Sequence, residues 1–204
     1  NPNKQYIEIV RQFYDHNSCP FSIHKIIELG IYFDIKPGDW FGPNSISQVL
    51  KILVNRTNNC QIQVLVSLDS IIYKEEVREK FVSENKSLVI FHPVRLGLNE
   101  INSIYYPFLY KLFKLKSFLG LIGGKPSSSY YFIGIDNFYN LYYLNPHTAQ
   151  EHVPFRDITL KSLMSPNIQK IHIDKIDPSM SLCFYFKNIT EFELFSETID
   201  ESNG

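Results

Sequence analysis

The stretch that decides the fold is "YYFIGIDNFYNLYYLNPHTAQ", residues 130–150. Two runs of aromatic and β-branched residues flank a short polar turn that contains Asp136 and Asn137, a pattern typical of a β-hairpin. The second run ends at Pro146 and His147. The stretch therefore predicts two antiparallel strands that carry a histidine at the mouth of the hairpin.

Segments on either side of the hairpin also show periodic patterns. Apolar runs or alternation predict further strands at 60–69, 87–98, 168–176 and 181–187. Helical spacing of apolar residues predicts helices at 6–13, 22–30, 41–54, 74–81 and 99–115. We expect Gly30 to stop the second helix, Pro93 to interrupt its strand, and Asn99 to cap the last helix. Residues 118–129 are expected to form a strand edge or helix end that runs into a loop. Because helices are predicted mainly in the first half of the chain and strands in the second, the expected fold class is α+β with a mainly antiparallel sheet.

Composition narrows the function classes. The chain has 204 residues, enough for a single domain, and a net charge of −1, which gives no electrostatic argument for nucleic acid. No apolar run is long enough to span a membrane, and no signal peptide opens the chain. Cys19, Cys60 and Cys183 are far apart, which argues against a disulfide framework and for a cytoplasmic location. The histidines show no ligand spacing, so we expect neither a metal nor a cofactor.

Asn145 and His147 form the first candidate site. Residues i and i+2 of an extended segment point to the same side, so these two side chains can pair as an orienter and a base. Asn-Pro also favours a turn, and His147 as an ordinary turn residue is the alternative.

Two loops supply further candidates. "GGKPSSS", residues 123–129, lacks phosphate-binding spacing and is either a substrate-gating loop or a plain connector. Trp40, the only tryptophan of the chain, lies between two glycines and is either a core anchor or part of a ligand platform.

Several longer motifs resemble the autophagins, the cysteine peptidases that process the ubiquitin-like modifier of autophagy. The matching segments keep the family's order and cover nearly the whole chain. They are "FSIHKI" at 21–26, "GDWFGPNSISQVLK" at 38–51, "RLGLNEIN" at 95–102, "GLIGGKPSSSYYFIG" at 120–134, "YYLNPHTAQ" at 142–150 and "DPSMSLCFYFK" at 177–187.

The resemblance implies a papain-like cysteine peptidase fold with a Cys–His–Asp site and residues 1–204 as a single peptidase domain. The family's Asp-Pro-His segment falls on Asn145, Pro146 and His147, so His147 inherits the base role and Asn145 the orienting role. Trp40 resembles the tryptophan that covers the active-site groove. Gly123, Gly124 and Pro126 resemble the substrate-gating loop, with Pro126 at its tip.

The implied activity is cleavage after the C-terminal glycine of the modifier, both as a free precursor and linked to phosphatidylethanolamine. We accordingly expect a monomer that meets a membrane surface only transiently and binds no nucleic acid.

The chain departs from the family pattern at two points. Asn145 stands where the family has Asp; an amide oxygen still accepts a hydrogen bond from imidazole but supplies no charge. The family's nucleophile lies in a "CGWGC"-type segment upstream of the part that resembles residues 6–26, so we expect the fold to be incomplete at its N-terminus. A non-catalytic module that binds the modifier without turnover is therefore the alternative.

Overall fold

The computed structural model describes residues 2–125, 127–147, 151–159 and 168–201. Its α-helices are α1 (Pro2–Arg11), α2 (Ile23–Gly30), α3 (Pro43–Arg56), α4 (Lys74–Ser83), α5 (Tyr106–Leu112) and α7 (Ile189–Glu201). Its strands are β1 (Ile62–Val66), β2 (Ser87–Arg95), β3 (Phe118–Lys125), β4 (Ser128–Ile135), β5 (Asn140–Leu144), β6 (Gln169–His172) and β7 (Ser179–Phe186). Short 3₁₀ turns cover Ile31–Phe33, Ser103–Tyr105, Phe155–Asp157 and Ile173–Lys175.

The strands form one seven-stranded sheet in the order β1-β2-β7-β3-β4-β5-β6. Only β1 and β2 pair in parallel, and every other neighbour is antiparallel. The structure thus confirms the α+β class and the mainly antiparallel sheet. β3 is a central strand between β7 and β4, not the strand edge or helix end expected from its sequence. The glycines of β3 interrupt an otherwise apolar and largely buried run, so its sequence does not show the pattern of a central strand.

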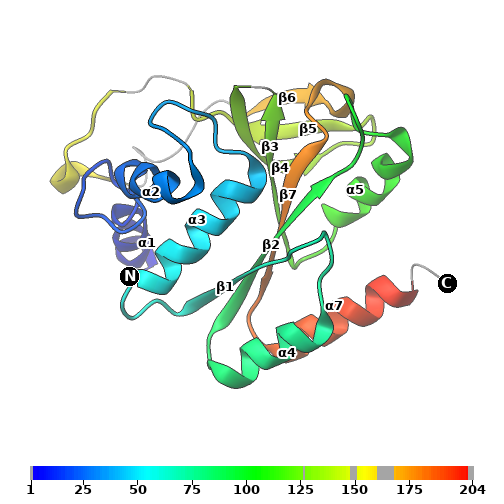
Figure 1. Cartoon of the computed structure of the whole chain (residues 1–204), viewed down its shortest axis with the longest axis horizontal. Coiled ribbons are helices and arrows are strands. Elements are labelled where there is room, and N and C mark those ends of the chain that lie inside the picture. Colours follow the sequence, from blue (N-terminus) through cyan, green and yellow to red (C-terminus); the bar gives the residue numbers. More distant parts are fainter. Residues whose placement is uncertain (1, 126, 148–150, 160–167, 202–204) are drawn as a thin grey trace.

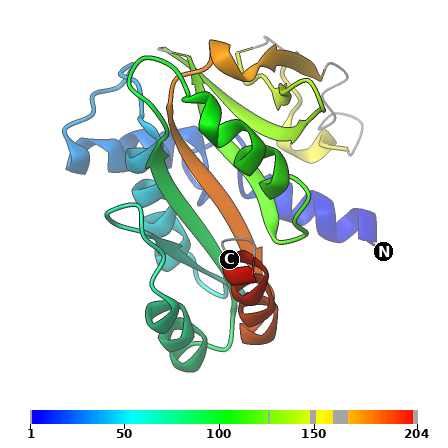
Figure 2. The same cartoon turned by 90° about the vertical axis from the view of Figure 1, so that its right-hand side faces the viewer.

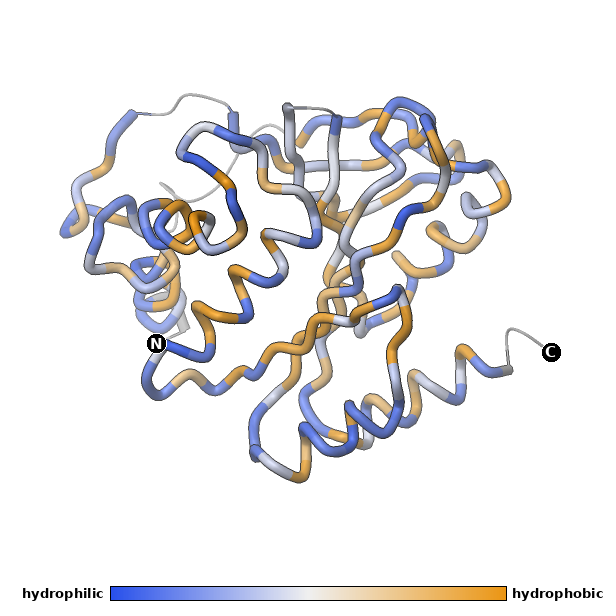
Figure 3. Tube along the Cα trace, viewed as in Figure 1, coloured by the Kyte–Doolittle hydropathy of each residue, from blue (hydrophilic) through white to orange (hydrophobic). Residues whose placement is uncertain are grey.

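Helices cover both sides of this sheet. Helices α1, α2 and α3 gather on one side, and α5 lies on the other (Figure 1). Figure 2 shows the same sheet from its side, where its twist is evident. Apolar residues concentrate along the central strands in Figure 3, in agreement with a main core around Leu88, Ile90, Leu121 and Phe132. A smaller cluster around Leu29, Val49 and Leu53 joins α2 to α3.

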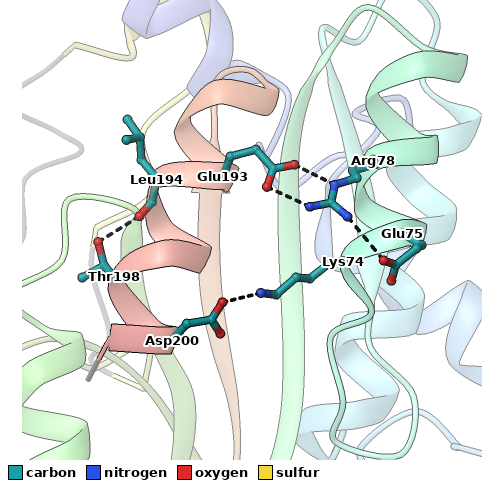
Figure 4. Close-up of polar contacts among 7 residues, drawn as sticks. All are labelled: Lys74, Glu75, Arg78, Glu193, Leu194, Thr198 and Asp200. Atoms are coloured by element: carbon teal, nitrogen blue, oxygen red, sulfur yellow. Dashed lines mark hydrogen bonds and ion pairs between the residues drawn. The ribbon is translucent and has the colours of Figure 1, made fainter. Parts of the chain in front are cut away.

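Helices α4 and α7 are joined by ion pairs at their exposed faces (Figure 4). Lys74 Nζ lies 2.6 Å from Asp200 Oδ2, and the Arg78 guanidinium binds both carboxylate oxygens of Glu193 at 2.7 and 3.0 Å. The guanidinium holds the pKa of Glu193 below its usual value. Because these pairs are solvent-exposed, they orient the two helices more than they stabilise the fold.

The predicted hairpin is present as β4 and β5, and Asp136 organises its turn. Its Oδ1 accepts the backbone N–H groups of Phe138 and Asn140, both at 2.9 Å. Hydrogen bonds from Asn140 lower the pKa of the Asp136 carboxyl. The turn residue that the sequence singled out therefore closes the hairpin by an Asx-type turn.

Strand β2 continues through Pro93, so the expected interruption is wrong. Phe91 accepts a hydrogen bond from Ser67 on the β1 side, and strand alternation turns Pro93 to that same side. β1 ends at Val66, opposite Phe91. No ladder hydrogen bond is lost there, because no neighbouring strand requires the missing N–H.

Of two predicted helix boundaries, one is confirmed, because α2 ends at Gly30, and one differs. Gly30 keeps helical backbone angles and the chain continues as a 3₁₀ turn, ending at Asp34 with φ 58°. A Cβ at Gly30 would lie 2.4 Å from Cζ of Phe41, so close packing explains this glycine. Asn102, not Asn99, caps the turn before α5, because its side chain accepts from the backbone of Ile104.

Candidate active site

The end of β5 brings Asn145 and His147 together. Nδ1 of His147 lies 2.9 Å from Oδ1 of Asn145, and the backbone N–H of His147 donates to the same oxygen at 3.0 Å. The imidazole also meets the Tyr130 ring edge-on, with 6.0 Å between centroids. Tyr130 in turn packs against Tyr143 at 4.4 Å. The imidazole is thus held by the hairpin that carries it.

This contact selects the tautomer of the neutral ring. The Oδ1 atom of Asn145 is an acceptor only, so its partner Nδ1 must carry the proton when the imidazole is neutral. Nε2 then has a free lone pair. In this tautomer the outward nitrogen can accept a proton, which is the state that a general base requires.

A cavity of about 550 Å³ opens beside His147. One wall comes from the β-sheet side, with Ile122, Ser129 and His147, and the other from the loop before α3, with Trp40. Nε1 of Trp40 donates to Oγ of Ser129 at 2.8 Å across the cavity. The structure therefore joins the Trp40 loop to β4 at the same place as the histidine.

The predicted gating glycines lie apart from this cavity lining. Gly123 and Gly124 are buried in β3. A Cβ on Gly124, which has φ +149°, would lie 2.0 Å from the carbonyl oxygen of Ser128. Gly124 is thus required by the tight β3–β4 connection. Pro126 lies outside the described residues.

No cysteine lines the described part of the cavity. Cys19 and Cys183 are buried, and Cys60 is half-buried after α3. Burial raises the pKa of the Cys183 thiol to about 12. A thiol in that state is a poor nucleophile, because the thiolate is the reactive form.

Within the described ranges, no group of three or more His, Cys, Asp or Glu side chains is arranged to hold a metal ion. The helices that the structure describes are all too short or too polar to cross a membrane.

The sequence predicted no role for Gln169, and it included Ser129 only as the last residue of the 123–129 loop. Ser129 lies 89 residues from Trp40, and Gln169, which contacts Asn145, lies 24 residues away. Both belong to ordinary strands. Only strand order and register bring them to the site.

A twisted, mainly antiparallel sheet that presents an Asn–His pair beside a cleft, with helices on the opposite wall, agrees with the class of papain-like cysteine peptidases, to which the matching family model assigns the chain. The chain belongs to the peptidase C54 family, because the model of the peptidase C54 catalytic domain matches residues 1–198.

Similar proteins carry peptidase names. The chain is 37% identical over 207 residues to the cysteine protease ATG4 of Candida albicans, covering 97% of this chain and 46% of that protein. It is 35% identical over 197 residues to the cysteine protease ATG4D of Xenopus laevis, covering 90% of this chain and 42% of that protein. It is 31% identical over 226 residues to human cysteine protease ATG4A, covering 93% and 56% respectively. The chain therefore spans about half the length of these relatives.

Proposed function

We propose that this chain is the base-carrying part of a cysteine endopeptidase. The enzyme cleaves after the C-terminal glycine of the ubiquitin-like autophagy modifier and releases the modifier from phosphatidylethanolamine. The observation that carries the proposal is the Asn145–His147 hydrogen bond at the edge of a cavity that also contains Trp40. Membership of the peptidase C54 family supports it. The working form is a cytoplasmic monomer that meets the membrane only through its lipid-linked substrate.

In the proposed reaction, a cysteine from outside residues 1–204 gives its proton to Nε2 of His147. The thiolate sulfur attacks the carbonyl carbon of the substrate glycine, and the C–N bond breaks as the imidazolium returns the proton to the leaving amine. A water molecule then loses a proton to Nε2 as its oxygen attacks the thioester carbonyl carbon; the C–S bond breaks, the acid product leaves, and the sulfur takes the proton back from the imidazolium. Asn145 holds the ring in position throughout and accepts from Nδ1–H.

The cavity suits an extended glycine tail. The Trp40 indole and Ser129 of β4 stand on opposite sides of it, joined by the 2.8 Å hydrogen bond. Once this hydrogen bond opens, a tail without a Cβ near the scissile bond passes between the two walls more easily than one with a larger side chain.

The activity test uses the protein with its upstream cysteine-containing segment. The substrate is the modifier with a C-terminal extension after its glycine. We expect cleavage at that glycine, loss of about 10²–10⁴-fold in rate for His147→Ala, and little change for His16→Ala, an exposed histidine elsewhere. Absence of cleavage together with no labelling of the cysteine in the added segment by a thiol-reactive probe would reject the peptidase.

A binding test needs only residues 1–204. Trp40 is the sole tryptophan, so intrinsic fluorescence reports directly on the cavity. We expect a peptide copying the modifier's tail to change the emission in a saturable way, and a peptide with Gly→Leu at the cleavage position to bind more weakly.

Asn145 favours one alternative, a module that binds the modifier without turnover. An amide supplies no negative charge to stabilise the imidazolium. Asn145→Asp distinguishes the two functions: faster cleavage indicates a peptidase with a weakened orienter, whereas unchanged tail binding with no cleavage in either variant indicates a binding module.

A further inference from the structure

Gln169, the first residue of β6, contacts the amide nitrogen of Asn145, the end of that side chain that does not meet His147. Nδ2 of Asn145 donates to Oε1 of Gln169 at 3.3 Å. β6 pairs with β5 so that Gln169 stands opposite Tyr143, which places it diagonally from Asn145. Long side chains reach across such a diagonal, which explains why a glutamine makes this contact.

An asparagine in the orienting position has a requirement that an aspartate does not have. Both ends of a carboxylate accept hydrogen bonds, whereas an amide accepts at one end and donates at the other. Only the orientation with Oδ1 toward His147 supports Nδ1–H and leaves Nε2 free. A flipped amide would present N–H to the ring and favour the opposite tautomer.

We propose that Gln169 is a positioning residue that holds the Asn145 amide in its working orientation. Its Oε1 accepts from Nδ2 on one side, while the backbone N–H of His147 donates to Oδ1 on the other. In a flipped amide, Nδ2 would face that backbone N–H, placing donor against donor. The backbone N–H thus selects the orientation, and Gln169, with its Oε1 facing Nδ2, stabilises the amide in that orientation.

The proposal rests on the proposed function for its catalytic meaning, but its structural part stands without cleavage. It also ties Gln169 to the amide at position 145. With Asp at that position, either oxygen serves the imidazole, so the glutamine has no orientation left to select.

The first experiment measures the imidazole itself in residues 1–204. Nitrogen-15 NMR of His147 distinguishes the protonated from the unprotonated ring nitrogen. We expect Nδ1–H in the unaltered protein, a mixture of tautomers in Gln169→Met, and recovery in Gln169→Glu, which keeps an acceptor of the same length. An unchanged spectrum in a folded Gln169→Met variant would overturn the proposal.

The second experiment measures cleavage by the protein with its upstream segment. We expect Gln169→Met to lower kcat about 2- to 10-fold with KM unchanged, because one of the two orienting contacts remains. Gln169→Glu should restore kcat. In an Asn145→Asp background, Gln169→Met should leave kcat unchanged.

The outcomes separate the two ideas. An equal loss of kcat in both backgrounds would make Gln169 a merely structural residue and reject its positioning role. A tautomer shift in the NMR experiment without any cleavage by the intact protein would reject the peptidase and leave the positioning role standing.

Discussion

Replacing Ser129 by alanine removes the acceptor of the hydrogen bond that joins Trp40 to β4. This contact spans the cavity beside His147 and links segments 89 residues apart. If the cavity must open for a substrate tail to enter, the contact stabilises the closed state. Ser129→Ala should then raise the population of the open state.

The size of the effect follows from the geometry. A neutral hydrogen bond contributes about 0.5–1.5 kcal/mol net. The Trp40 side chain is already 43% exposed, so water replaces the serine hydroxyl at little cost. We therefore expect the lower part of that range, about 0.5–1 kcal/mol, which shifts the opening equilibrium about 2- to 5-fold.

Two fluorescence measurements on residues 1–204 test this expectation. Acrylamide should quench Trp40 more strongly in Ser129→Ala, and the tail peptide should bind about 2- to 5-fold more tightly, since more of the protein is competent to bind. Ser128→Ala is the matched control, because adjacent strand residues point to opposite faces. Weaker peptide binding, or quenching no different from the control, would refute the closed-state role of this hydrogen bond.

Three further predictions concern buried groups. Iodoacetamide at pH 8 should label the half-buried Cys60 in the native protein, while mass spectrometry should find Cys183, whose pKa burial raises to about 12, unlabelled until urea is added. Burial lowers the pKa of His92 below its ordinary 6.5, so the unfolded chain binds a proton at this histidine more readily than the folded protein does. The free energy of unfolding should therefore fall as pH drops below about 6.5. His92→Gln should remove this part of the dependence of stability on pH. Gly120→Ala should lower the free energy of unfolding, measured in urea, by about 2–4 kcal/mol. The reason is that Gly120 has φ +129° and an added Cβ would lie 2.2 Å from a backbone oxygen of β4. Gly134→Ala should lower it much less, and near-equal losses in the two variants would contradict this reasoning.

Much of the fold follows from local patterns. The β4–β5 hairpin was predictable because alternation of aromatic residues and the Asp136 turn both operate within a few residues. The path of β2 through Pro93 was not. That path depends on where β1 ends, and no residue near Pro93 in the sequence indicates the end of β1.

Some features of the candidate site were likewise predictable from the sequence, and others were not. The Asn145–His147 pair was predictable from its spacing, but not its backbone: Pro146 and His147 form a turn after β5 in place of the expected extended segment, and Oδ1 of Asn145 accepts the backbone N–H of His147 as in an Asx turn. The roles implied for Gly123 and Gly124 came from resemblance, and the structure places both in buried β3 instead of the cavity lining.

The sequence by itself determined most of the elements, the Asn–His pair and the family resemblance, since periodicity, turn chemistry and motifs each depend on only a few neighbouring residues. Only the tertiary structure decided that Ser129 meets Trp40 and that Gln169 meets Asn145. Those contacts depend on strand order and register, which are selected by burial of the whole apolar core. The orientation of the Asn145 amide, on which the proposed chemistry depends, is therefore a property of the folded sheet.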